Sequence, residues 1–177
     1  MLERKFEVRV PTREDWNTPA CPPSGLMSHC VYTDGSKLDG GVGGGVFSDD
    51  LNLRMSFRLP DHCSVFQAEV AAIETAAARL LEMQILDTEI CILSDSQAAL
   101  KALPSNLSHS KTVIGCRITL DRLATRTTLS LCWIPGHSNF IGNDAADELA
   151  RKGTLEQLTV AWQHLNMPLI SWKLMNG

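Results

Sequence analysis

The sequence predicts an α/β domain in which helices cover the faces of a mixed sheet. Three runs with strand character, at about residues 29–35, 41–48 and 51–59, follow one another with short connections, as the strands of hairpins do. Beyond residue 60, helical patterns alternate with strand patterns. Hairpin strands followed by alternating helices and strands indicate one mixed sheet with helices packed on its faces.

The first hairpin is rich in glycine. Residues 31–50 contain six of the twelve glycines in the chain, a density that also occurs in phosphate-binding loops. The spacing of such loops does not fit, because Val46 stands where the G-x-G-x-x-G pattern needs its third glycine. We interpret the glycines as strand positions that neighbouring backbone or a ligand approaches closely. Asp34 then lies at the end of the first strand.

The middle of the chain contains a long helix and a buried strand. Ser64 is a candidate N-cap for a helix that continues to about Met83. Residues 88–94 (TEICILS) form a short, nearly continuous apolar run, which is typical of a strand at the centre of a sheet. The short helix that follows this strand ends at Pro104.

Three further elements complete the predicted domain. A helix covers residue 111 to about residue 125, and an alternating strand covers residues 128–134. We expect Asn143 to cap a last helix and Gly153 to end it.

The chain length of 177 residues fits one domain with a substantial core, which we assign to residues 29–153. Residues 1–28 contain four prolines and no sustained period, so we expect an extended leader or linker there. Residues 154–177 form a C-terminal extension, for which both a packed helix and a linker remain open.

Composition argues against several classes of protein. No uninterrupted apolar run approaches the length of a membrane span, and the charged N-terminus is unlike a signal peptide. The six cysteines include no C-x-x-C pair, so we expect no zinc site and reduced, intracellular thiols. The net charge of −4 argues against a generic basic coat for nucleic acid. The same net charge is compatible with an enzyme that binds phosphates through metal ions at an acidic site.

One carboxylate occupies a position that ordinary surface charges avoid. In the long helix, Glu69 heads a stripe that is otherwise apolar, so its side chain should face the sheet. A carboxylate directed at a core costs on the order of several kcal/mol unless it is paired or bound to a metal. Glu74 lies on the opposite side of the helix, where we expect a solvated charge.

Three other polar residues have an ordinary and a functional explanation. Asp95 follows the apolar strand at the edge where ligands of α/β proteins bind, but Asp95 or Ser94 would equally suit the N-cap of the next helix. Asp147 lies among acidic residues that also suit the macrodipole at a helix start. His137 lies in the loop before that helix. Considered alone, a loop histidine is typically an exposed surface residue.

Together the carboxylates indicate a more specific feature, a metal-binding cluster. Four of them stand in separate elements that one sheet would bring together: Asp34, Glu69, Asp95 and Asp147. Repelling carboxylates gather around cations, and hard oxygen ligands favour Mg²⁺ or Mn²⁺. Two such ions about 3.5–4 Å apart can activate a water and stabilise a leaving oxygen in phosphodiester cleavage.

The motifs TDGS, QAEVAAI, SDSQAAL and WIPGHSNFIGNDAADELAR, in this order and spacing, closely resemble the type 1 ribonuclease H domain. The resemblance is especially close to the domains of non-LTR retrotransposon polyproteins and covers about Cys30 to Gly153. It implies a five-stranded mixed sheet, with three antiparallel strands first, flanked by helices. It also implies Mg²⁺-dependent endonucleolytic cutting of the RNA strand of an RNA–DNA hybrid, with two ions for which Mn²⁺ is expected to substitute.

The resemblance also implies a role for each residue. The catalytic and metal-binding carboxylates are then Asp34, Glu69, Asp95 and, rather than Asp144, Asp147. His137 matches the mobile loop histidine that assists product release or proton transfer.

Substrate contacts follow in the same way. Gln97 matches a position that contacts the RNA backbone. Discrimination of RNA from DNA needs contact with 2′-hydroxyls, for which the backbone of Gly35 and Ser36, with Glu69 and Gln97, are candidates. The glycines of the first hairpin would then let the minor groove of the hybrid approach the sheet.

The chain departs from the family pattern at two places. Asp144 stands where glutamate is usual, which keeps the charge and shortens the reach. Leu103 to Lys111 is short and not basic, whereas cellular bacterial enzymes carry a basic helix and loop there. We therefore expect a weaker grip on the substrate, or a grip supplied by a partner or by a fused reverse transcriptase.

Two alternatives compete with a hybrid-specific ribonuclease. The first is a catalytically inactive domain of the same fold that binds nucleic acid or serves as a scaffold, although all the matched site residues are intact. The second is a DNA transposase or integrase, whose acidic residues have a different spacing and which gives no reason for Gln97.

Overall fold

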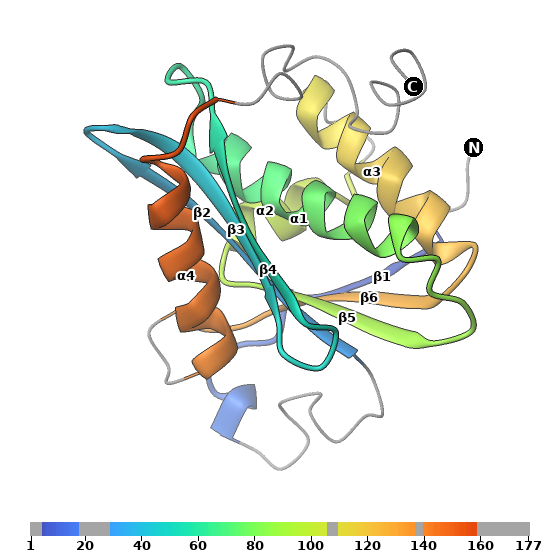
Figure 1. Cartoon of the computed structure of the whole chain (residues 1–177). Coiled ribbons are helices and arrows are strands. Elements are labelled where there is room, and N and C mark those ends of the chain that lie inside the picture. Colours follow the sequence, from blue (N-terminus) through green and yellow to red (C-terminus); the bar gives the residue numbers. More distant parts are fainter. Residues whose placement is uncertain (1–4, 18–28, 106–109, 137–139, 159–177) are drawn as a thin grey trace.

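The computed structural model describes residues 5–17, 29–105, 110–136 and 140–158 (Figure 1). Predictions for other residues, among them His137 and the tail beyond residue 158, lie outside this described part. Within it, the helices and strands follow the predicted order, with one additional strand close to the N-terminus and a short 3-10 turn at Asp15–Asn17.

One six-stranded mixed sheet forms the centre of the molecule (Figure 1). Its strands are β1 (Glu7–Arg9), β2 (His29–Leu38), β3 (Gly41–Ser48), β4 (Leu53–Leu59), β5 (Glu89–Ser94) and β6 (Thr128–Trp133). Their order across the sheet is β1-β6-β5-β2-β3-β4. β2, β3 and β4 pair antiparallel, whereas β5, β6 and β1 continue the sheet from β2 in parallel. The mixed sheet that the sequence predicts is therefore confirmed.

Four α-helices of the described part of the chain cover the two faces of this sheet. They are α1 (Val65–Glu82), α2 (Gln97–Ala102), α3 (Lys111–Ala124) and α4 (Ile141–Gly153). Figure 1 shows α1, α2 and α3 on one face and α4 on the other, against the meander of β2, β3 and β4. Among the described residues, no helix is both long enough and apolar enough to cross a membrane.

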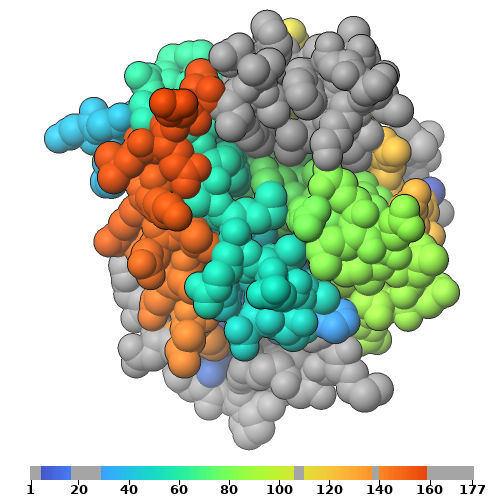
Figure 2. Space-filling view, in the orientation of Figure 1, coloured from blue at the N-terminus to red at the C-terminus, as the bar shows by residue number. Residues whose placement is uncertain are grey.

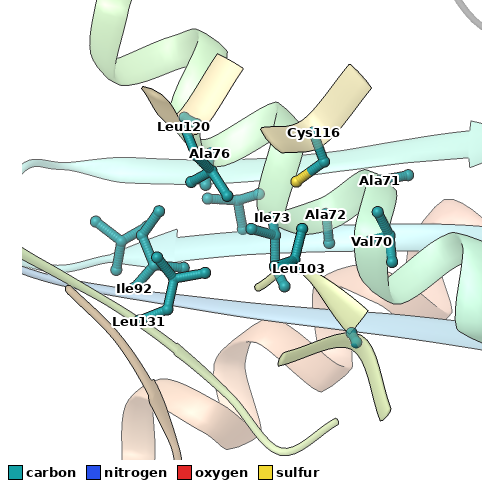
Figure 3. Packing of buried hydrophobic residues seen from close by; sticks show 14 of the residues in the cluster. Val70, Ala71, Ala72, Ile73, Ala76, Ile92, Leu103, Cys116, Leu120 and Leu131 are labelled. Atoms are coloured by element: carbon teal, nitrogen blue, oxygen red, sulfur yellow. The ribbon is translucent and has the colours of Figure 1, made fainter. Parts of the chain in front are cut away.

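The core lies between α1 and the sheet. Figure 3 shows Ile73 of α1, Ile92 of β5 and Leu131 of β6 in one buried cluster, and all three side chains are fully buried. Cys116 and Leu120 of α3 pack on α1 from the other side. The apolar stripe predicted for this helix, including the inward Glu69, is buried as expected.

The predicted start of α1 is also confirmed. The Ser64 side chain accepts a hydrogen bond from the Gln67 backbone N–H, and the Gln67 side chain accepts one from the Ser64 backbone N–H. This reciprocal capping box satisfies two N–H groups that the first turn of a helix otherwise leaves unpaired. It fixes the direction in which α1 enters the sheet and hence the position of Glu69.

The expected solvation of Glu74 is wrong. Its side chain is only 4% exposed, and the Thr119 hydroxyl of α3 lies 3.4 Å from Glu74 Oε1. Because α3 packs over the face of α1 that turns away from the sheet, α1 is buried on two sides. The apolar stripe of α1 predicts the face that packs on the sheet, but it does not predict that α3 covers the opposite face.

The predicted cap of the last helix is also wrong. α4 begins at Ile141 with Phe140 in the N-cap position, and Asn143 is 5% exposed inside the first turn. The helix starts early because its first residues pack against β2. A Cβ added to Gly142 would lie 2.2 Å from the Tyr32 ring, so this turn is in direct contact with the sheet.

The implied count of five strands is one short. β1, within the segment predicted to be a leader, pairs in parallel with β6 in the register Glu7↔Ser130 and Arg9↔Cys132. Phe6 is 4% exposed, and Val8 and Val10 pack against the core. The buried residues supply the apolar contact that attaches this short strand to the sheet edge.

The glycines of β3 permit the close approach of α4. A Cβ added to Gly45 would lie 2.2 Å from the Ala146 carbonyl oxygen, and one added to Gly43 would lie 2.5 Å from the Ala150 carbonyl oxygen. Figure 2 shows α4 directly beside the β3–β4 hairpin. At these two positions the close neighbour is therefore helix backbone, and the glycines do not form a surface that a hybrid can approach.

Candidate metal centre

Three carboxylates meet where β5 ends beside the middle of β2. The predicted position of Asp34 at the end of its strand is wrong, because pairing with β3 extends β2 to Leu38. Asp34 of β2, Glu69 of α1 and Asp95, directly after β5, each offer an oxygen, and these oxygens lie within 4.8 Å of one another. Asp34 and Glu69 are buried, and Asp95 is half-buried. Such a cluster has the hard oxygen donors that Mg²⁺ and Mn²⁺ prefer.

The sheet register and one glycine bring these groups together. β2 and β5 are parallel neighbours, with Thr33 opposite Ser94, so Asp34 of β2 lies beside Asp95, the first residue after β5. Glu69 comes close because α1 packs directly on Gly35, where an added Cβ would lie 2.5 Å from the Glu69 backbone nitrogen. A larger residue at position 35 would push the helix, and its carboxylate, away from Asp34.

Asp95 does not cap the following helix. The N-cap of α2 is Ser96, whose hydroxyl accepts a hydrogen bond from the Ala99 backbone N–H. Trp133, at the end of β6, donates its indole N–H to the Asp95 carbonyl oxygen at 3.0 Å and thereby fixes the backbone of this residue. The ordinary explanation for Asp95, helix capping, is thus removed.

Asp147 joins the cluster from the opposite face of the sheet. Its side chain on α4 is 34% exposed and forms a salt bridge with Arg151, 2.8 Å between Oδ2 and Nη2. A hydrogen bond from the protonated Asp34 carboxyl to Asp147, together with the Asp147 charge, contributes to the raised pKa of Asp34. Asp147 therefore lies beside Asp34.

Burial and mutual repulsion keep protons on the inner carboxylates. Burial first, and then the charges of Asp95 and Asp147, raise the pKa of Asp34 to about 8. Burial first, and then the charge of Asp34, raise the pKa of Glu69 well above its usual range. The Gly35 backbone N–H donates to these carboxylates and partly offsets both shifts. Without a cation, the site cannot hold all of its charges.

One atom of the cluster lacks any partner in the described part of the structure. Glu69 Oε2 is buried and accepts no hydrogen bond from the described residues. A buried carboxylate oxygen without a donor is costly unless a cation or water occupies the position next to it. The donor set, the repulsion and this orphaned oxygen all fit a divalent cation bound among Asp34, Glu69 and Asp95.

The pKa of Asp34 predicts how the stability of the metal-free protein depends on pH. Because about 8 is above the ordinary value of 3.8, the folded state keeps a proton that the unfolded chain releases between these pH values. The free energy of unfolding should therefore fall as pH rises from about 4 to about 8. Urea unfolding in chelator at pH 5 and pH 8 measures this, and Asp34→Asn should show a smaller pH effect. An equal pH effect in both proteins would contradict the assignment.

An open cleft of about 450 Å³ lies beside the cluster. Glu69, Asp95 and the exposed Gln97 line it, and so do three residues that were not predicted as site residues, Arg13, Trp133 and Gly136. At Gly136 an added Cβ would lie 2.8 Å from Asp95 Oδ2, so the loop after β6 passes directly over this carboxylate. The WIPG run at the end of a predicted strand was the available signal for two of the three.

The other predicted contact residues lie near the cluster in different ways. Gly35 is buried and its N–H faces the carboxylates, whereas Ser36, the next residue of β2, is half-buried. The Gln97 side chain accepts a hydrogen bond from Lys101 Nζ at 3.1 Å, within the same short helix. His137 follows Gly136 in sequence but lies outside the described residues.

These features define a class of protein: a mixed α/β sheet with a carboxylate cluster, suited to divalent cations, over its central strands. The model of the RNase H family matches residues 27–155 of the chain. The match covers well over half of the sequence and contains every residue of the cluster, so the chain belongs to the RNase H family.

Individual relatives agree with this membership. Ribonuclease H1 of Rattus norvegicus is 28% identical, with 80% of this chain and 57% of that protein covered. Ribonuclease H1 of Homo sapiens is 29% identical, with 70% of this chain and 49% of that protein covered. The chain thus spans about half the length of the curated relatives that it matches.

A solved structure supports the fold. The crystal structure of RNase H1 from the halophilic archaeon Halobacterium salinarum NRC-1 superimposes with a TM-score of 0.55, at 22% sequence identity. The match covers 71% of this chain and 96% of that one. The likeness confirms the architecture of a mixed sheet flanked by helices.

Proposed function

We propose that this protein is an endoribonuclease that hydrolyses the RNA strand of RNA–DNA hybrids with two Mg²⁺ ions, for which Mn²⁺ can substitute. The observation that carries the proposal is the meeting of Asp34, Glu69 and Asp95 within 4.8 Å in a chain of the RNase H family. Relatives with about 28% identity bear the name Ribonuclease H1, which supports the same reaction.

Asp34, Glu69, Asp95 and Asp147 would hold the ions. When bound, the ions supply a nucleophilic water at neutral pH and stabilise charge on the leaving oxygen. The protein's contribution is placement, because Asp34 lies on a central strand and Glu69 on a helix whose entry is fixed by a capping box. The Gly35 N–H orients both of these carboxylates.

Groups around the cleft would select the substrate. The backbone of Gly35 and Ser36 lies next to Asp34, and Gln97 is exposed at the start of α2 on the cleft wall. Hydrogen bonds from such groups to 2′-hydroxyls distinguish an RNA strand from a DNA strand. His137, which directly follows Gly136 of the cleft in sequence, is proposed to assist proton transfer or product release.

The origin of the chain is part of the proposal. The motifs TDGS, QAEVAAI, SDSQAAL and WIPGHSNFIGNDAADELAR resemble the domains of non-LTR retrotransposon polyproteins. We therefore propose a retrotransposon origin and a fused or associated reverse transcriptase as a partner. The RNA–DNA hybrid made by such an enzyme would be the substrate of the proposed activity.

The proposed activity is tested with three labelled duplexes, RNA–DNA hybrid, double-stranded RNA and double-stranded DNA, each with and without Mg²⁺. We expect cutting of the RNA strand of the hybrid alone, and only with the metal. The Asp95→Asn variant serves as the inactive control.

Two results would favour other functions. A wild-type protein that binds the hybrid but leaves it uncut in Mg²⁺ and in Mn²⁺ would indicate an inactive scaffold domain. Cutting of the DNA duplex would indicate the chemistry of a transposase or integrase.

A further inference from the structure

We propose that residues 5–17, which we call the N-terminal arm, bring a cation, Arg13, to the substrate cleft, where it binds a backbone phosphate of the nucleic acid. This inference rests on the proposed function, because it concerns the grip on the same substrate. It goes beyond that function because the arm precedes the part of the chain that the family model matches, residues 27–155.

The arm is attached to the sheet by backbone pairing and by apolar contacts. β1 extends the sheet at its β6 edge, with Val8 opposite Leu131. Phe6 is 4% exposed, and Val8 and Val10 pack against the core. The arm therefore follows β6 toward its carboxyl end, which is the end that borders the cleft.

The second half of the arm is held by a turn that encloses Arg13 and by the packing of Trp16 just after it. Asp15 accepts hydrogen bonds from the Thr12 backbone N–H at 2.6 Å and from the Thr12 hydroxyl at 2.8 Å, which closes a tight turn. Trp16 packs against the cluster that includes Leu93 and Ile134. Its ring also meets the Phe140 ring edge to face, with 5.3 Å between centroids.

This turn places Arg13 on the wall of the cleft with Glu69, Asp95 and Gln97. The Arg13 side chain is exposed, and the ion pairs found among the described residues do not include it. The neighbouring carboxylate of Asp15 is already engaged by Thr12. Arg13 is therefore a cation at the rim of an acidic site, available to a ligand.

A cation at the cleft rim would offset the repulsion between the carboxylate cluster and the phosphates of the substrate. The carboxylate cluster repels phosphates, and divalent ions held by Asp34, Glu69 and Asp95 would offset that repulsion close to the cluster. The segment from Leu103 to Ser110 contains no lysine or arginine that could hold the flanking phosphates. An arginine at the cleft rim can bind a phosphate through two parallel hydrogen bonds and adds a salt-dependent share of the affinity.

The test compares Arg13→Ala and Arg13→Lys with wild type and with Arg126→Ala. Arg126 is an exposed arginine just before β6, at the end of that strand away from the cleft, so its substitution removes the same charge elsewhere. Cleavage of the hybrid gives kcat and KM at several salt concentrations. Hybrid binding is measured by fluorescence anisotropy. Each substitution is combined with the inactivating Asp95→Asn so that the hybrid stays uncut during the measurement.

For Arg13→Ala we expect KM and the dissociation constant to rise about three- to tenfold near 0.1 M salt. The kcat should stay within about twofold, and the slope of log affinity against log salt should become shallower by about one. Arg13→Lys should recover part of the affinity, and Arg126→Ala should match wild type. The melting temperature of Arg13→Ala should be unchanged, since the side chain is exposed.

The inference and the proposed function fail in different ways. If wild type cuts the hybrid and Arg13→Ala equals Arg126→Ala in KM, affinity and salt slope, the arm does not grip the substrate. If no protein cuts the hybrid, the proposed function fails, and the binding measurements still decide the role of Arg13. A parallel loss in Arg13→Ala and Arg126→Ala would reveal only a general effect of net charge and would also overturn the inference.

Discussion

Asp34→Asn should lower the rate of hybrid cleavage by about a thousandfold or more while the chain remains folded. The substitution keeps the shape of the side chain but removes a negative charge from the centre of the carboxylate cluster, where Asp34 lies within 4.8 Å of Glu69 and Asp95. Initial rates on labelled RNA–DNA hybrid at saturating Mg²⁺ measure the loss, and circular dichroism checks the fold.

Asp144→Asn is the matched control for this experiment. Asp144 is an exposed aspartate in the first turn of α4, one turn before Asp147, so the same chemical change there leaves the cluster intact. We expect its activity to remain within a few-fold of wild type. Retention of full activity by Asp34→Asn would exclude this cluster as the catalytic centre.

Removing the Asp34 charge should also strengthen the metal-free fold. Burial and the neighbouring carboxylates disfavour the ionised form, which is why the pKa of Asp34 is about 8. The asparagine has no such conflict, so the variant should resist urea at pH 8 at least as well as wild type does in chelator. In many enzymes, residues that are needed for activity lower the stability of the fold.

Gly45→Ala should be among the most destabilising single changes outside the carboxylate cluster, at about 3 kcal/mol in the free energy of unfolding. The added Cβ would lie 2.2 Å from the Ala146 carbonyl oxygen and 2.5 Å from the Ala150 nitrogen. Both are helix backbone atoms, so α4 as a whole must move away from β3. Since α4 carries Asp147, activity should fall as well. Urea unfolding and hybrid cleavage measure the two effects.

The control for this prediction is Gly40→Ala, in the turn between β2 and β3. There the nearest atom to an added Cβ is Leu155 Cδ2 at 3.8 Å, an ordinary contact distance. We expect a change within about 0.5 kcal/mol. If both variants unfolded at the same urea concentration, the close packing of α4 on β3 would not be a determinant of the fold.

Local patterns were sufficient to predict most of the elements. The stripe headed by Glu69 and the cap at Ser64 depend on residues close in sequence, and both are confirmed. The burial of Glu74 depends on α3, about forty residues further along the chain, and no pattern within α1 indicates that contact. In the same way, contact between Gly142 and Tyr32 moved the start of α4 ahead of Asn143.

The strand β1 shows a different limit. Phe6, Val8 and Val10 alternate with charged residues, which is a period-two signal, but it is only three apolar residues long and precedes a run rich in proline. A signal this short becomes a strand only because the edge of β6 is available to pair with it. Sequence alone therefore could not place Arg13.

The carboxylate cluster could be predicted from the sequence because of the topology of the sheet. Asp34 and Asp95 each directly follow a run of strand residues, and these two runs pair in parallel, with Thr33 opposite Ser94. The two carboxylates therefore lie side by side, although β2 itself continues to Leu38. The helix stripe then directs Glu69 to the same place. The cleft residue Trp133 was not predicted as a site residue, although it begins the WIPG run, because its contact is with the backbone carbonyl oxygen of Asp95.

The central claim is that Asp34, Glu69 and Asp95 hold divalent cations, and the anomalous scattering of Mn²⁺ in crystals of the wild-type protein tests it most directly. We predict an anomalous peak among these three carboxylates, with Mn–O distances of about 2.2 Å, and no such peak at this position in crystals of Asp34→Asn. Peaks confined to other carboxylates, or none at all at millimolar Mn²⁺, would contradict the claim.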